Sequence, residues 1–105
     1  MDYKFDFKFE PVVEEEDEEQ EDELAYRYDT QLLCDGENLD EDKIRGHFNT
    51  EFVGNCLLVV GDKNMIKIHY HTNEPWKVLE YMASLGEIYD IVVEDMVRQS
   101  QGKKG

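Results

Sequence analysis

The sequence predicts an α+β protein of the ferredoxin-like class, a split β-α-β sandwich in which a four-stranded antiparallel sheet carries two helices on one face. Three observations predict it. Four segments either alternate as half-buried strands do or form short apolar runs. In two other segments, apolar residues recur at helical spacing. The order of these segments along the chain is strand, helix, strand, strand, helix, strand. That order predicts the spatial strand order 4-1-3-2. The 105 residues suffice for one domain with one core.

The first 23 residues differ from the rest of the chain in composition. Aromatic and charged residues alternate from residue 3 to residue 9, which predicts a strand that lies on a sheet edge or on another chain. Residues 14 to 23 are almost all acidic and repel one another, so they cannot bury themselves. We therefore expect an aromatic strand and an acidic linker at 1–23, the ferredoxin-like domain at 24–98, and a disordered tail at 99–105.

The first strand and the first helix of the domain follow from two different periods. Residues 24 to 33 alternate between an apolar and a polar face, and Asp35 with Gly36 then supplies a turn. Asp40 or Asn38 can cap the helix that follows, and acidic residues suit its first turn. The polar face of the strand contains Arg27, Asp29 and Gln31, and the apolar stripe of the helix contains Leu39, Ile44, Phe48 and Phe52.

A hairpin is expected next. Residues 56 to 60 form a short apolar run, residues 65 to 72 alternate, and the segment 61 to 64 between them has the composition of a turn. This turn has one glycine and opens no helix, so it does not match a phosphate-binding loop. We expect no nucleotide site here.

The second helix and the fourth strand complete the domain. Asn73 or Thr72 can cap the helix, Pro75 fits its first turn, and Gly86 is a typical stop. Residues 88 to 93 are rich in β-branched residues and are expected as the last strand. The helical positions expected in the core are Trp76, Val78, Leu79, Met82 and Leu85.

Charge and cysteine content argue against several kinds of partner. The chain has 26 acidic and 11 basic residues and a net charge of −15, which repels nucleic acid. It has no apolar run near the ~20 residues of a membrane span and no basic and apolar N-terminal signal. Cys34 and Cys56 are too few for a disulfide framework, so we expect two buried thiols in a cytoplasmic protein.

Two histidines and one carboxylate lie where they can meet. His69 and His71 are two residues apart on one strand, so both side chains point to one side of the sheet, with Cβ atoms ~7 Å apart. In the ferredoxin-like order this strand neighbours the first strand, whose polar face includes Asp29. The three side chains form a ligand set for zinc or another divalent ion, with a fourth place for water or another side chain. The alternative is a hydrogen-bonded cluster without metal.

Longer motifs surround these residues. Residues 61 to 75 read Gly-Asp-Lys-Asn-Met-Ile-Lys-Ile-His-Tyr-His-Thr-Asn-Glu-Pro, and Val-Leu-Glu-Tyr follows at 78 to 81. Upstream, residues 26 to 33 read Tyr-Arg-Tyr-Asp-Thr-Gln-Leu-Leu. The chain thereby resembles the middle domain of the large subunit in fatty acid kinases, a family also described as dihydroxyacetone-kinase-like or DAK phosphatase. The resemblance spans residues 24 to 98.

The resemblance implies a zinc site and two partners. In the family, the middle domain binds zinc through a cysteine of the first strand and two histidines; His69 and His71 match, and Asp29 stands at the cysteine position. A carboxylate is a harder ligand than a thiolate and leaves a more labile site. The family's partners are an ATP-binding kinase domain and a fatty-acid-binding protein. This sequence contains no match to that kinase domain, so we expect no enzyme activity from this chain alone.

The expected function is a non-catalytic regulatory or scaffold domain of a fatty-acid-kinase-like protein that binds a metal and dimerises. Self-association would use the helix-free sheet face or the N-terminal strand. One alternative is a metal-dependent hydrolase using Asp29, His69 and His71, which would need a pocket around the metal. Another is a small-ligand sensor, which would need a cleft at a dimer seam.

Overall fold

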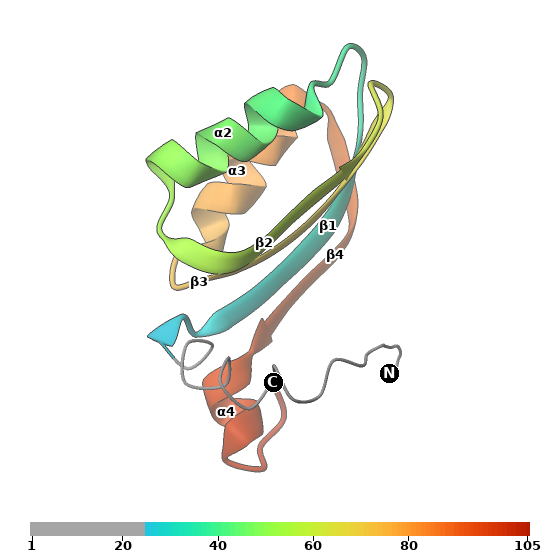
Figure 1. Ribbon diagram of the computed structural model, residues 1–105. Coiled ribbons are helices and arrows are strands. Elements are labelled where there is room, and N and C mark those ends of the chain that lie inside the picture. Colours follow the sequence, from blue (N-terminus) through green and yellow to red (C-terminus); the bar gives the residue numbers. More distant parts are fainter. Residues whose placement is uncertain (1–24) are drawn as a thin grey trace.

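A four-stranded antiparallel sheet, covered on one face by two helices, forms the body of the protein (Figure 1). The computed structural model describes residues 25–105, so the predicted aromatic strand and acidic linker lie outside the described residues. The element order is strand, helix, strand, strand, helix, strand, followed by a short helix, α4. This order confirms the predicted ferredoxin-like fold.

The strands are β1 (Tyr28–Asp35), β2 (Gly54–Gly61), β3 (Met65–Thr72) and β4 (Glu87–Asp95). Their order in the sheet is β2-β3-β1-β4, as predicted, and every neighbouring pair is antiparallel. The strand β3 has the bounds that its alternation predicts. The other three differ by one to four residues at their ends, because end residues pair with neighbours that the local pattern does not reveal.

The helix α2 (Glu41–Glu51) begins at one of its two predicted caps. The side chain of Asp40 accepts a hydrogen bond from the backbone N–H of Lys43 at 3.1 Å, which satisfies one free donor of the first turn. Ile44 and Phe48 are the buried residues of this helix, so its apolar stripe faces the sheet as expected.

The helix α3 (Pro75–Leu85) begins differently from the prediction. Its N-cap position is Glu74, which makes no side-chain cap bond. The hydroxyl of Thr72 accepts from the N–H of Glu74, and the side chain of Asn73 accepts from the N–H of Arg27, so neither side chain is the cap. Gly86 ends the helix, as predicted, and its N–H donates to the carbonyl of Met82.

The core lies between the helices and one face of the sheet. Its buried side chains are Leu32, Cys34, Ile44, Phe48, Val59, Ile66, Ile68, Tyr70, Val78 and Met82.

Two residues expected in the core are exposed. Trp76 is 59% exposed, because Pro75, Val78 and Met82 form the inward face of α3 and Trp76 projects beside that face. Cys56 is exposed as well, whereas Cys34 is buried as predicted. Cys56 has a φ of +57° in a bulge of β2, where the register shifts between Asn55 and Leu58 and the alternation fails.

The C-terminal helix α4 (Met96–Ser100) extends past the end of the predicted domain at residue 98. The carboxylate of Asp95 accepts from the N–H of Arg98 at 3.0 Å and from the guanidinium of Arg27 at 2.8 Å. The N–H of Lys103 also donates to the carbonyl of Arg98. The segment 99–105, expected as a disordered tail, thus begins inside a helix and bonds back to it.

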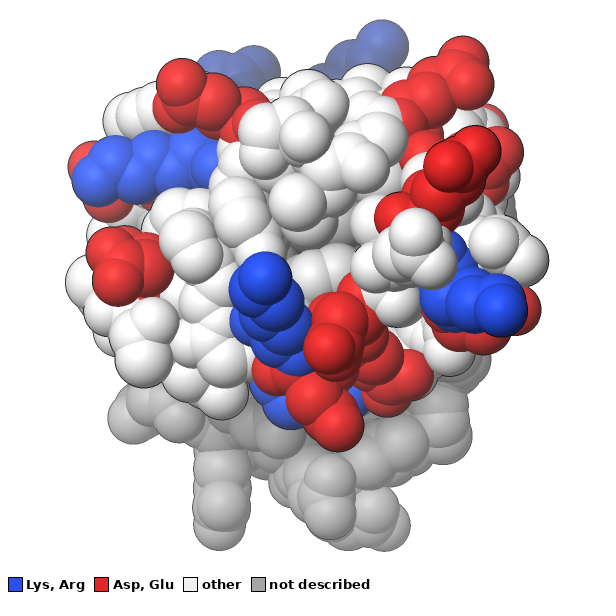
Figure 2. All heavy atoms as spheres, turned by 90° about the horizontal axis from the view of Figure 1, so that it is seen from above, with Lys and Arg blue, Asp and Glu red and all other residues white. Residues whose placement is uncertain are grey.

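Charged side chains of both signs are interspersed on the face seen in Figure 2. The basic side chains there are scattered among acidic ones, with uncharged surface between them. Within residues 25–105, no helix combines the length and apolar composition that crossing a membrane requires.

Candidate metal centre

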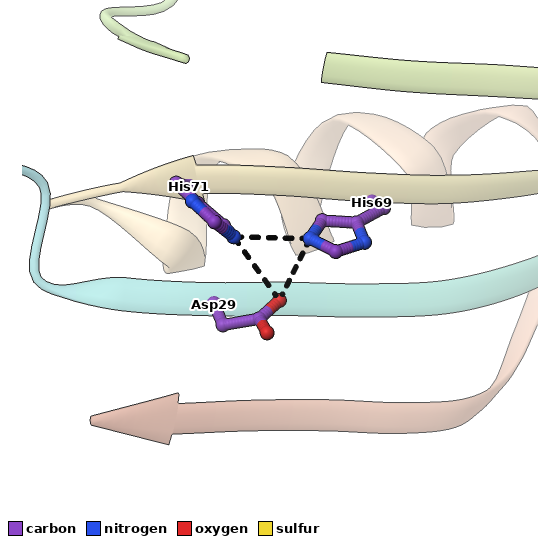
Figure 3. A group of neighbouring side chains, drawn as sticks. All are labelled: Asp29, His69 and His71. Atoms are coloured by element: carbon purple, nitrogen blue, oxygen red, sulfur yellow. Dashed lines mark hydrogen bonds and ion pairs between the residues drawn. The ribbon is translucent and has the colours of Figure 1, made fainter. Parts of the chain in front are cut away.

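The sheet register brings the three predicted ligand residues together. Asp29 of β1 lies directly opposite His71 of β3, and His69 lies opposite Gln31. Cross-strand partners point to the same face of a sheet, and residues two apart on one strand do so too. All three side chains therefore lie on the helix-free face and point toward one another (Figure 3).

The distances within this triad suit one metal ion. Asp29 Oδ1 lies 3.2 Å from His69 Nε2 and 3.9 Å from His71 Nε2, and the two Nε2 atoms are 3.0 Å apart. Zinc binds such atoms at 2.0–2.2 Å, so two ligand atoms in a tetrahedral site lie about 3.3 Å apart. The three observed separations lie on both sides of this value. Small side-chain rotations would make them equal around an ion.

Burial keeps His71 in the neutral form that can bind a metal ion. Only 5% of His71 is exposed, and this burial lowers its pKa to about 4; the charge of Asp29 opposes the shift and that of His69 adds to it. His71 is therefore neutral at pH 7. A neutral imidazole offers the lone pair that a metal needs.

The neighbours of Asp29 favour a cation beside it. The side-chain amide of Gln31 donates to both carboxylate oxygens, at 3.4 and 3.5 Å. On its other side Asp29 lies opposite Glu94 of β4. Two like charges directly opposite on a sheet destabilise it, and a bound cation would offset that repulsion.

The donor set consists of two imidazole nitrogens and one carboxylate oxygen, which fits zinc and several other divalent ions. No ion is identified. In a tetrahedral site these residues would leave a fourth position, open to water or to another side chain.

Other groups considered from the sequence do not join the triad. The turn after β2 is a hairpin turn, in which the carboxylate of Asp62 accepts from the N–H groups of Asn64 and Met65. Burial raises the pKa of the Cys34 thiol, which lies 3.6 Å from the carbonyl of Met82, so Cys34 is a core thiol and not an activated nucleophile.

Two hollows occur in the described surface, and one of them borders the triad. One, of about 140 Å³, is lined by residues from Glu37 to Ile44 together with Tyr81 and Leu85. The other, of about 210 Å³, is lined by Gln31, Leu32, Leu33, Lys67 and Asp90. Neither is lined by a triad residue, but the second lies on the face of the triad, because Gln31 donates to Asp29 and pairs with His69.

Sequence reasoning missed two neighbours of the triad. Asn55 lies opposite His71, and Glu94 lies opposite Asp29. Each stands one residue outside a predicted strand. Extending the strands at 56–60 and 88–93 by one residue would have found them, but their local composition gives no reason to do so.

These features define a ferredoxin-like α+β domain whose open sheet face carries a cluster of residues of the kind that binds metal ions. Residues 25–103 match the FakA-like middle domain family, the middle domain of proteins that resemble the A-subunit of fatty acid kinase, and the chain belongs to that family.

Curated relatives are found in staphylococci. An uncharacterized protein of Staphylococcus epidermidis is 34% identical over 98 residues, which cover 90% of this chain and 16% of that protein. An uncharacterized protein of Staphylococcus aureus is 33% identical over 81 residues, which cover 73% of this chain and 14% of that protein. The chain thus spans a small part of the length of these relatives.

Proposed function

We propose that this chain is a non-catalytic scaffold or regulatory domain of a fatty-acid-kinase-like protein, and that it holds one divalent metal ion through Asp29, His69 and His71. The convergence of these three side chains on the open sheet face carries the proposal. The ion would tie β1 to β3 on the face of the sheet opposite to α2 and α3. In the larger protein, the partners would be an ATP-binding kinase domain and a fatty-acid-binding protein.

Zinc is the first candidate for this ion, because two imidazoles and a carboxylate are common zinc ligands. The carboxylate of Asp29 is a harder donor than a thiolate, so we expect an exchangeable ion rather than a permanently held one. Other divalent ions that accept imidazole and carboxylate would compete with zinc.

We favour a positional role over hydrolysis for this ion. A metal-dependent hydrolase needs a pocket that holds its substrate beside the ion, and neither hollow described above is lined by Asp29, His69 or His71. The triad instead lies on one face of a sheet, with His71 almost completely buried.

The same face is suited to self-association. Four apolar side chains on it are about 40% exposed: Leu58, Val60, Met65 and Val92. Leu58 and Val60 lie opposite His69 and Lys67, which assigns them to the face of the triad. We propose that a second copy of the chain covers this face, with residues 1–10 assisting.

Metal content tests the site. The protein, purified without chelator or nickel, should contain about one divalent ion per chain by elemental analysis, as one tetrahedral site requires. Asp29→Ala and His69→Ala should lose it. Asp42→Ala and His47→Ala are matched controls, because Asp42 is on the surface of α2 and His47 stacks on Tyr81. Equal metal in all five proteins would contradict the site.

Light scattering tests the association. We expect a dimer that weakens when residues 1–10 are removed and in Leu58→Glu, which places a charge on the open face. Val53→Glu is the control, since Val53 is 68% exposed but precedes the sheet. A monomeric wild-type protein would rule out this part of the proposal.

A further inference from the structure

Two buried polar atoms beside the triad have no hydrogen-bond partner within the described part of the chain. They are Nδ1 of His71 and Oδ1 of Asn55. A buried polar atom without a partner is costly, so each such atom in a folded protein calls for a physical explanation. Here the two atoms belong to neighbouring residues.

The register makes Asn55 and His71 direct cross-strand partners. Asn55 of β2 lies opposite His71 of β3, and Gly54 lies opposite Thr72, so the pairing is regular up to Asn55 and the bulge begins after it. Cross-strand partners have Cβ atoms about 4.5–5.5 Å apart on the same face. A Cβ on Gly54 would collide with the carbonyl oxygen of His71, so the backbones approach closely here. The two side chains are not hydrogen-bonded to each other in this structure, so a contact between the amide and the imidazole requires rotation of one or both side chains.

The two orphan atoms are complementary when a metal is bound. The triad converges through Nε2 of His71, and a metal on Nε2 leaves the ring proton on Nδ1. Nδ1–H is then a buried donor, while Oδ1 of Asn55 is a buried acceptor. Metal-bound histidines almost always donate their second ring N–H to an oxygen acceptor, which fixes the ring and its tautomer.

We propose that Asn55 is a positioning residue of this centre, whose side-chain oxygen accepts the Nδ1–H of His71 and so holds the Nε2 lone pair toward the ion. The assignment rests on the proposed metal site. Asn55 would touch the ligand and not the ion. Its bond also gives β2 a link to a site that β1 and β3 otherwise form alone.

The experiment compares zinc binding by the full chain and three variants. Asn55→Ala removes the acceptor, Asn55→Asp keeps an oxygen at the same position, and Asn49→Ala makes the matched change on the exposed side of α2. Zinc affinity is measured by competition with a chromophoric chelator. Melting in excess chelator reports the stability of the metal-free protein.

We expect Asn55→Ala to bind zinc about 10- to 100-fold more weakly than wild type, the usual effect of removing such a partner. Asn55→Asp should recover the affinity, and Asn49→Ala should match wild type. In the zinc-loaded wild type, the Nδ1 proton of His71 should be protected from exchange and visible by NMR, and Asn55→Ala should lose that signal. If the role of Asn55 were purely structural, Asn55→Ala would change the melting temperature in excess chelator. It would leave the Nδ1 proton signal of His71 in place, and Asn55→Asp would show no specific recovery of zinc affinity.

Two different results would overturn the assignment, and each contradicts a different part of it. Unchanged zinc affinity in Asn55→Ala, with zinc bound by wild type, would contradict the role of Asn55 alone. Failure of wild type to bind zinc or cobalt would contradict the metal site and with it this role. If Asn55→Ala does not fold, the affinity and the proton signal of Asn55→Asp decide the question.

Discussion

The two faces of the sheet differ although the same strands form both. On β1, Thr30, Leu32 and Cys34 point into the core and are at most 1% exposed, while Asp29 and Gln31 point to the open face. The covered face supplies the burial that stabilises the fold, and the open face carries the triad together with partly exposed apolar side chains. The division means that a ligand on the open face can change without removing a side chain from the core.

The largest effect is expected for a leucine of β1 on the covered face. Leu32 is 1% exposed and packs in the core, so Leu32→Ala should reduce the free energy of unfolding by about 2–5 kcal/mol. Urea unfolding of the metal-free protein measures it. A loss below about 1 kcal/mol would mean that the covered face does not carry the stability assigned to it.

Acid should destabilise the metal-free protein through His71, which lies on the open face. Burial holds the pKa of His71 at about 4, below the ordinary 6.5, so the unfolded state binds a proton more readily than the folded state between these values. Stability is then full above pH 6.5 and falls as pH falls toward 4. Each pKa unit is worth ~1.4 kcal/mol, so the metal-free protein should lose about 3 kcal/mol from this residue.

Urea unfolding at pH 7 and pH 4 measures this loss, with His71→Gln as the control that lacks the ionisable ring. Carboxylates titrate in both proteins, so the difference between the two isolates His71. Equal losses in wild type and His71→Gln would contradict a buried neutral imidazole.

Leu33→Ala should have the smallest effect on stability. Leu33 is the neighbour of Leu32 but pairs with Lys67 on the open face and is only partly buried. We expect a loss of at most about 1 kcal/mol, well below that of Leu32→Ala. If the two alanine variants unfold at the same urea concentration, the two faces do not differ as described.

The periodicity of the residues was enough to predict the strands and helices, and their order matched a ferredoxin-like plan that predicts the strand order and the meeting of Asp29 with the two histidines. Strand β3 shows this best: its eight residues alternate in sequence, so its bounds and the faces of its side chains could be predicted. The fold then places β1 beside it, and one predicted contact brings in the others.

Local irregularities were beyond the sequence pattern. Cys56 and Asp90 have φ values of +57° and +51° at bulges of the edge strands, where an extra residue breaks the alternation. Thr72 was a candidate cap but instead bonds across to the carbonyl of Val53 and accepts from Glu74. Such features depend on neighbouring segments, which periodicity does not report.

Diffraction from crystals of the zinc-loaded protein tests the central claim most directly. Anomalous scattering at the zinc absorption edge should show one strong peak per chain, about 2.0–2.2 Å from Asp29 Oδ1, His69 Nε2 and His71 Nε2. A zinc peak bound elsewhere, or no peak between these three side chains at saturating zinc, would contradict the account.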